Sequence, residues 1–128
     1  MCHVLEHFSF EEVGKILRNF HKKLKVGGVL RLSVPDFNRL ITVYHANGNN
    51  LELIKFALMG GQDYAYNYHK CVFNRAVLEN QLAACGFAHM AEWNTLEEFG
   101  VHLRDWSETG FETPEGEFPI SLNMKAMK

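Results

Sequence analysis

The stretch "HVLEHFSFEEVGKILRNFHKKLKVGGVLRLSVPD", residues 3–36, decides the fold. Ser9 and Glu12 have the spacing of a capping box, which predicts a helix that begins at Phe10. Apolar side chains then recur at helical spacing, and a glycine pair at 27–28 ends the helix. A short run rich in β-branched and leucine residues follows at 29–34 and stops at Pro35, which predicts a strand. The apolar helix positions are Phe10, Val13, Ile16, Leu17, Phe20 and Leu24.

The rest of the chain alternates helices and strands. Asp36 is placed to cap a helix that ends near Asn47-Gly48, and Asn74 is placed to cap another. Two predicted strands close the chain without a predicted helix between them, which favours an α/β fold with an antiparallel hairpin at one edge of the sheet. The further predicted elements are helices 51–58 and 75–85, strands 87–93 and 118–125, an aperiodic segment 62–72, and a polar loop 94–117 with a weak helical signal at 96–99.

Composition places the chain among ordinary globular proteins. It has 128 residues, of which 47% are hydrophobic and 22% charged, and we predict one domain over residues 1–128. The formal net charge of −2 gives no basic excess to neutralise phosphates, which argues against a nucleic-acid partner. The three cysteines share no C-x-x-C spacing and are read as reduced thiols. With no signal peptide or membrane span in the sequence, we expect a cytoplasmic protein.

Residues 3–7 also spell H-x-x-E-H, the pattern of one class of zinc hydrolase. Such a site needs both histidines on one face of a helix, but the capping box starts the helix only at Phe10. A third ligand would also be needed, and Glu79 is the obvious nominee on a later helix. The sequence therefore disfavours a zinc hydrolase, and we expect no metal.

The motifs Leu5-Glu6-His7, Leu24-Lys25-Val26-Gly27-Gly28 and Pro35-Asp36 resemble the class I S-adenosylmethionine (SAM)-dependent methyltransferases, in register with one another. Val26 stands where that family usually has proline. The stretches "GGQDYAYNYH", "LAACGF" and "SLNMKAMK" are similar to a subgroup described as predicted methyltransferases. The resemblance covers essentially the whole chain and is most specific in its first third.

The resemblance implies part of a Rossmann-like sheet, in three layers, formed by the last strands and helices of that family. The family binds SAM mainly through a glycine-rich loop (E/D-x-G-x-G-x-G), which these 128 residues do not contain. The chain thus resembles the C-terminal half of a methyltransferase. We expect methyl transfer from SAM to an unknown acceptor as the parent activity, and neither SAM binding nor turnover by a chain truncated in this way.

The resemblance also implies a set of site residues at the carboxyl edge of the sheet. Some of these residues also have a simpler structural interpretation. Glu6 suits a turn that enters a helix, and Asp36 suits a helix cap. The tyrosines at 64, 66 and 68 alternate as in an extended chain and also suit packing of a loop. The implied set is His7 and His69 for catalysis, His3, Leu5 and Glu6 for the cofactor, and Pro35, Asp36, Tyr64, Tyr66 and Asn67 for the substrate.

A second interpretation belongs to a different functional class. Without the early strands of the family, a half-fold exposes a sheet edge that can pair with a second copy or a partner. The chain would then be a non-catalytic interaction module. In either interpretation we expect a homodimer or larger oligomer, which light scattering can test.

Overall fold

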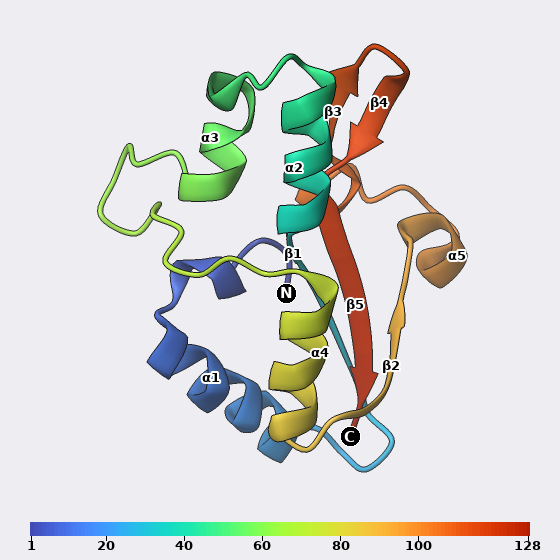
Figure 1. Ribbon diagram of the computed structural model, residues 1–128. Coiled ribbons are helices and arrows are strands. Elements are labelled where there is room, and N and C mark those ends of the chain that lie inside the picture. The colour runs from blue at the N-terminus through green and yellow to red at the C-terminus, as the bar shows by residue number, and fades with distance from the viewer.

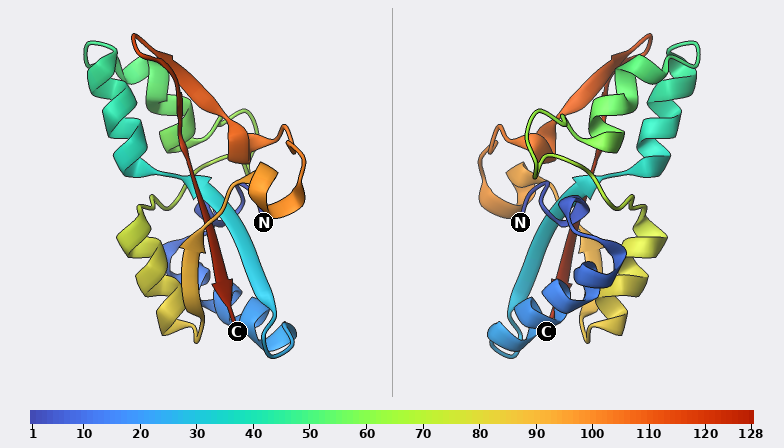
Figure 2. Two further views of the ribbon diagram at one scale, coloured as in Figure 1. Left: turned by 90° about the vertical axis from the view of Figure 1, so that its right-hand side faces the viewer. Right: turned by 90° about the vertical axis from the view of Figure 1, so that its left-hand side faces the viewer.

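A three-stranded sheet forms the centre of the computed structural model, which describes residues 1–128. Its strands are β1 (Val29–Pro35), β2 (Ala88–Glu92) and β5 (Ser121–Met127), in the order β1-β5-β2. The last strand of the chain therefore lies between the other two and pairs antiparallel with both (Figure 2). β2 is one edge of this sheet. The opposite edge, at β1, carries one short parallel bridge between Cys2 and Ser33.

Two helices cover the apolar face of the sheet. α1 (Phe10–Lys23) and α4 (Arg75–Ala84) lie side by side below the other helices in Figure 1. Because side chains alternate along a strand, leucines, valine, methionine and alanine of β1 and β5 all point to this face. The resulting main core includes Leu5, Val13, Leu17, Leu30, Leu32, Val34, Leu78, Leu82, Leu122, Met124 and Ala126.

The other face of the sheet is polar. Arg31 and Lys125 stand opposite each other in the β1–β5 pair, and both donate to the carboxylate of Glu98 on α5 (Thr95–Phe99). Asn123 donates to the carbonyl of Ser107 in the short helix η2 (Trp106–Glu108) at 2.9 Å. α5 and η2 therefore cover this face through polar contacts, in place of a layer of long helices.

A smaller apolar cluster lies beyond the carboxyl end of β1. α2 (Phe37–Ala46) and α3 (Leu51–Met59) pack on each other and on the hairpin of β3 (Gly110–Thr113) and β4 (Gly116–Pro119) (Figure 1). The pairs of this hairpin run from Gly110–Pro119 to Thr113–Gly116. The buried members of the cluster are Leu40, Val43, Ile54, Ala57 and Ile120.

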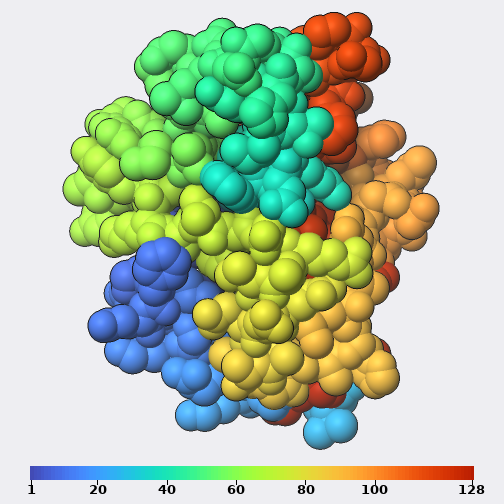
Figure 3. All heavy atoms as spheres, viewed as in Figure 1, coloured from blue at the N-terminus to red at the C-terminus, as the bar shows by residue number.

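The aperiodic segment 60–73 joins the two clusters. In Figure 3 it crosses the surface between α2 and α3 above and α1 and α4 below. The amides of Lys70 and Cys71 donate to the carbonyl of Glu6, at 2.7 and 3.1 Å, in the short helix η1 (Leu5–His7). At the other end of the segment, Phe73 forms a parallel bridge with Asp36. The segment is therefore held by backbone hydrogen bonds to both sides.

Most of the predicted elements are observed close to their predicted bounds. The Glu12 carboxylate accepts from the amide of Ser9 at 2.8 Å, so that side of the capping box is confirmed. Asp36 and Asn74 cap α2 and α4 through bonds to the amides of Asn38 and Val77. No helix in the structure combines the length and the apolar character that crossing a bilayer requires.

Two predictions about the sheet need correction. The strand predicted over 118–125 is two strands that separate at Ile120, because Pro119 ends the β4 pairing and β5 turns to pair with β1 and β2. The predicted polar loop 94–117 contains β3, which the sequence analysis missed. All pairs among the named strands are antiparallel, so the fold is mixed α/β with a small antiparallel sheet, and a Rossmann-like arrangement is not established.

Candidate functional site

A partly enclosed cavity of about 250 Å³ lies at the carboxyl end of β1. Its wall comes from the N-terminal segment, the end of β1, α3, the segment 60–73 and η2. Residues far apart in the sequence therefore meet at one place. They are His3, His7, Pro35, Phe56, Ala57, Tyr64, Asn67, His69, Trp106 and Ile120.

Backbone hydrogen bonds place the histidines of this cavity. The amide of His3 donates to the carbonyl of Ser33 at 2.9 Å, which fixes the N-terminal segment beside β1. The amide of His69 donates to the carbonyl of Met59 at 3.0 Å, at the end of α3. The rings of His7 and His69 then meet edge to face, with centroids 4.8 Å apart.

Glu6 lies beneath these rings with only 1% of its surface exposed. Its Oε1 is 3.3 Å from Nδ1 of His3 and 4.0 Å from Nε2 of His69. Neither carboxylate oxygen has a hydrogen-bond partner. A buried carboxylate without donors is costly, because it lacks the hydrogen bonds that normally stabilise such a group.

His69 has a defined tautomer when neutral. Its Nδ1 lies 3.0 Å from the carbonyl oxygen of Ala57, which can only accept, so Nδ1 carries the proton and Nε2 offers a lone pair. Burial lowers the pKa of His69 below its ordinary value, and the charge of Glu6 opposes this shift only in part. The ring therefore presents a proton-accepting nitrogen toward Glu6.

The remaining residues implied by the resemblance lie outside the cavity wall. Leu5 is fully buried in the main core, so its side chain is a packing residue. Asp36 accepts from the amide of Asn38 and pairs with Arg39 at 3.4 Å, which uses its carboxylate to cap α2. Tyr66 is 81% exposed and turns to solvent. The alternation 64–66–68 therefore does not place three tyrosines in one site.

Sequence reasoning missed the apolar wall of the cavity. The rings of Phe56 and Trp106 stack with centroids 5.9 Å apart, and Ala57 and Ile120 complete this side. These residues lie in helices or next to a strand, where apolar side chains usually indicate core packing. Only the tertiary arrangement brings α3 and η2 together, and no local pattern signals it.

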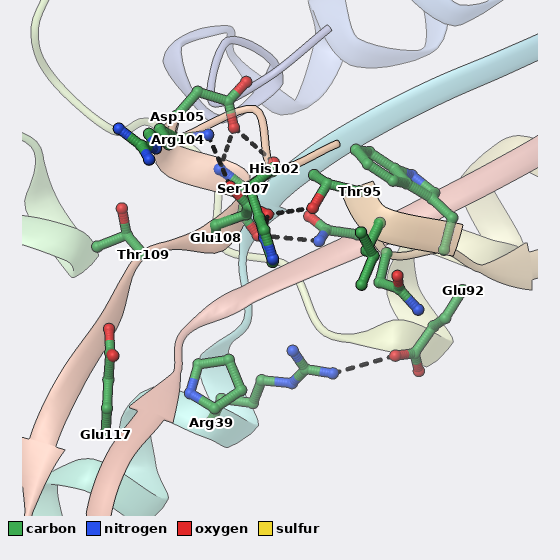
Figure 4. Close-up of a pocket in the computed structure, with 15 residues that line it drawn as sticks. Arg39, Glu92, Thr95, His102, Arg104, Asp105, Ser107, Glu108, Thr109 and Glu117 are labelled. Atoms are coloured by element: carbon green, nitrogen blue, oxygen red, sulfur yellow. Dashed lines mark hydrogen bonds and ion pairs between the residues drawn. The ribbon is translucent and has the colours of Figure 1, made fainter. Parts of the chain in front are cut away.

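A second cavity of about 950 Å³ opens on the polar side of the sheet (Figure 4). Its side chains mostly bond to one another. The Glu108 carboxylate accepts from the amide of Arg104 at 2.6 Å, from Nδ1 of His102 at 2.7 Å and from the hydroxyl of Thr95. These donors lower the pKa of Glu108 to about 2. We interpret this cluster as a structural clamp that fixes the loop between α5 and η2.

We expect Glu108→Gln to destabilise the protein in a pH-dependent way. The folded-state pKa of about 2 lies below the ordinary value of 4.5, so the carboxylate contributes stability above pH 4.5 that is lost as the pH falls toward 2. Urea unfolding at several pH values should show a difference between wild type and variant that is largest at neutral pH and shrinks in acid. The control is Glu117→Gln, because Glu117 lines the same cavity but its side chain forms no hydrogen bond. A difference between Glu108→Gln and wild type that stays constant with pH would contradict the assignment.

Comparisons with solved structures give a similarity in fold. No protein-family model matches the chain, and no curated protein matches its sequence. Among solved structures, the chain is similar to a crystal structure described as a "putative O-methyltransferase" from Nostoc punctiforme, with a TM-score of 0.51 and 16% sequence identity. The alignment covers 100% of this chain and 30% of that one. The similarity supports a methyltransferase-like fold and does not by itself define an activity.

Proposed function

We propose that this chain forms the methyl-acceptor side of a SAM-dependent methyltransferase site, and that the cavity at the end of β1 holds a small hydroxyl-bearing acceptor. The observation that carries the proposal is the convergence of His3, His7, Tyr64, Asn67 and His69 on one cavity. These are residues that the resemblance to methyltransferases implies for the site. The O-methyltransferase neighbour supports an oxygen acceptor.

The cavity suits an acceptor better than a whole cofactor. A volume of about 250 Å³ is small for a nucleoside-containing molecule, and the glycine-rich loop that cradles SAM in the family is absent from these residues. SAM, when bound, supplies the electrophilic methyl group. We therefore expect the 128-residue chain by itself to bind SAM no tighter than millimolar and to show no robust turnover.

The cavity offers both apolar and polar contacts to an acceptor. The stacked rings of Phe56 and Trp106 provide an apolar wall that binds a small ring and excludes water. The imidazoles of His7 and His69, which line the same cavity, can orient a hydroxyl and receive its proton. Positioning and desolvation are the contributions that a methyltransferase scaffold makes to this chemistry.

Binding of phenol and of its methyl ether, anisole, tests the proposal. The hydroxyl should reach the imidazoles of His7 and His69, so phenol should bind roughly tenfold more tightly than anisole, about 1.4 kcal/mol. Ligand affinities from NMR titration in excess EDTA, which keeps metal ions away, provide the measurement. His69→Gln should remove most of the preference, whereas His45→Gln, which removes an exposed imidazole bonded to Asn49, should keep it. Equal affinities in the wild type would contradict an acceptor site.

A further inference from the structure

We propose that Glu6, His7 and His69 form a binding site for a divalent transition-metal ion of the zinc class, beneath the histidines that line the cavity. One ligand atom from each of these residues lies within 4.8 Å of the others. His3 adds a fourth donor, since its Nδ1 is 3.3 Å from Oε1 of Glu6. The site goes beyond the proposed methyl transfer and does not depend on it.

The polar atoms of this cluster lack the partners that buried groups normally have. Both carboxylate oxygens of Glu6 and Nδ1 of His7 are buried without a hydrogen bond. Glu6 is 1% exposed, so bulk solvent does not reach its carboxylate. Since buried polar groups in folded proteins are almost always satisfied, each of these atoms points to a missing electrophile. A cation between them would satisfy the carboxylate and the imidazole together.

His69 and His3 have the supporting bonds typical of metal-binding histidines. The ring of His69 uses Nδ1 on the carbonyl of Ala57 at 3.0 Å, which leaves Nε2 facing Glu6. His3 uses Nε2 on the hydroxyl of Ser121 at 2.7 Å, which leaves Nδ1 facing the same carboxylate. Such bonds fix the tautomer and the orientation of a ligating ring. Both rings therefore have a nitrogen without a hydrogen bond close to the Glu6 carboxylate.

The donor set favours zinc over magnesium or calcium. Imidazole nitrogen with a single carboxylate suits Zn²⁺ and its neighbours among the transition metals, whereas Mg²⁺ and Ca²⁺ require six or more oxygen ligands. Tetrahedral Zn²⁺ with bonds of about 2.0–2.1 Å separates its ligand atoms by about 3.3 Å. The 3.3 Å between Glu6 and His3 matches this spacing, and the 4.0 Å between Glu6 and His69 requires a small contraction.

This site differs from the H-x-x-E-H zinc site considered from the sequence. His3 and His7 do not share a helix face: His3 precedes η1 and His7 ends it. Glu79, the nominee for a third ligand, pairs instead with Arg75 at 2.8 Å on the surface of α4. The third ligand is His69, which the segment 60–73 brings to Glu6. No hydrolase activity is implied.

Metal binding by the purified chain tests the proposal. After removal of metal with a chelator, we expect the chain to take one Zn²⁺ from a chromophoric indicator, with submicromolar affinity. Co²⁺ in the same site should give the visible absorption of a four- or five-coordinate ion without a thiolate charge-transfer band, which excludes the cysteines as ligands. His69→Gln and Glu6→Gln should each weaken binding by more than about a hundredfold, a larger loss than changes around a site usually cause.

Matched controls make the experiment decisive. His45→Gln removes an exposed imidazole that bonds Asn49, and Glu79→Gln removes a partly exposed carboxylate that pairs with Arg75; both variants should bind metal as the wild type does. His7→Gln alters a half-buried ligand and provides a third test if substitution of Glu6 unfolds the chain. Absence of stoichiometric binding to the folded wild type, or binding that the ligand substitutions do not weaken, would overturn the site. Because the phenol test is run in EDTA, its outcome is independent.

Discussion

Leu122→Ala is expected to reduce the free energy of unfolding by about 3–5 kcal/mol, because it leaves a cavity in the middle of the main core. Leu122 is completely buried on β5, the strand that joins the other two, and pairs with Val34 of β1. It belongs to the same cluster as Leu17 and Leu78 of the covering helices. Since domains of this size are stable by only about 5–15 kcal/mol, the variant should be close to unfolding at room temperature.

Urea unfolding followed by circular dichroism measures this loss. Val26→Ala provides the control, since Val26 is 93% exposed and should change stability by less than about 0.5 kcal/mol. A loss below about 1 kcal/mol for Leu122→Ala would mean that β5 is not the buried centre of the sheet.

Gly60→Ala should both destabilise the fold and disrupt the cavity. Gly60, at the end of α3, has φ 80° and ψ 169°, a combination that is essentially restricted to glycine. A Cβ there would lie 2.5 Å from the carbonyl oxygen of Asn67 and 3.1 Å from the amide nitrogen of His69. The backbone strain costs about 1–3 kcal/mol and relief of the clash a similar amount, so we expect a total loss of about 3 kcal/mol.

The second effect of this substitution is specific to the site. Relief of the clash must move the backbone that carries Asn67 and His69, so phenol and Zn²⁺ should both bind at least about tenfold more weakly to the folded variant. Gly48→Ala is the matched control: Gly48 also has positive φ, 68°, but a Cβ would meet no atom within 4 Å. It should cost about 1–2 kcal/mol and leave binding unchanged. If Gly60→Ala bound phenol and Zn²⁺ as tightly as the wild type, the position of segment 60–73 would not matter for binding.

The parts of the fold that the sequence predicts are those specified by local chemistry. The capping carboxylate of Glu12 and the caps at Asp36 and Asn74 define helix ends through bonds between neighbouring residues. The hairpin of β3 and β4 lacks a comparable signal. Its strands are short and largely polar, and it is stabilised by packing of Phe111 and Phe118 against α2 and α3. Such contacts depend on the tertiary structure.

The same distinction applies to the site. The resemblance to methyltransferases predicted His3, His7 and His69 together, and the structure brings them to one cavity. The unpaired carboxylate of Glu6 could not be predicted, because its burial depends on segment 60–73 folding back over η1. The stacking of Trp106 on Phe56 could not be predicted either, because the two residues lie far apart in the sequence.

The two tryptophans of the chain permit the most direct test of the central claim, that the cavity at the end of β1 binds the acceptor. Trp106 lines this cavity, whereas Trp93 lines the polar cavity of Figure 4 and packs on Phe99. The measurement is the pair of indole N–H signals in a ¹H–¹⁵N spectrum during titration with phenol, assigned with Trp106→Phe. The account predicts that the Trp106 signal shifts and the Trp93 signal does not. A shift of Trp93 alone, or of neither signal at saturating phenol, would contradict it.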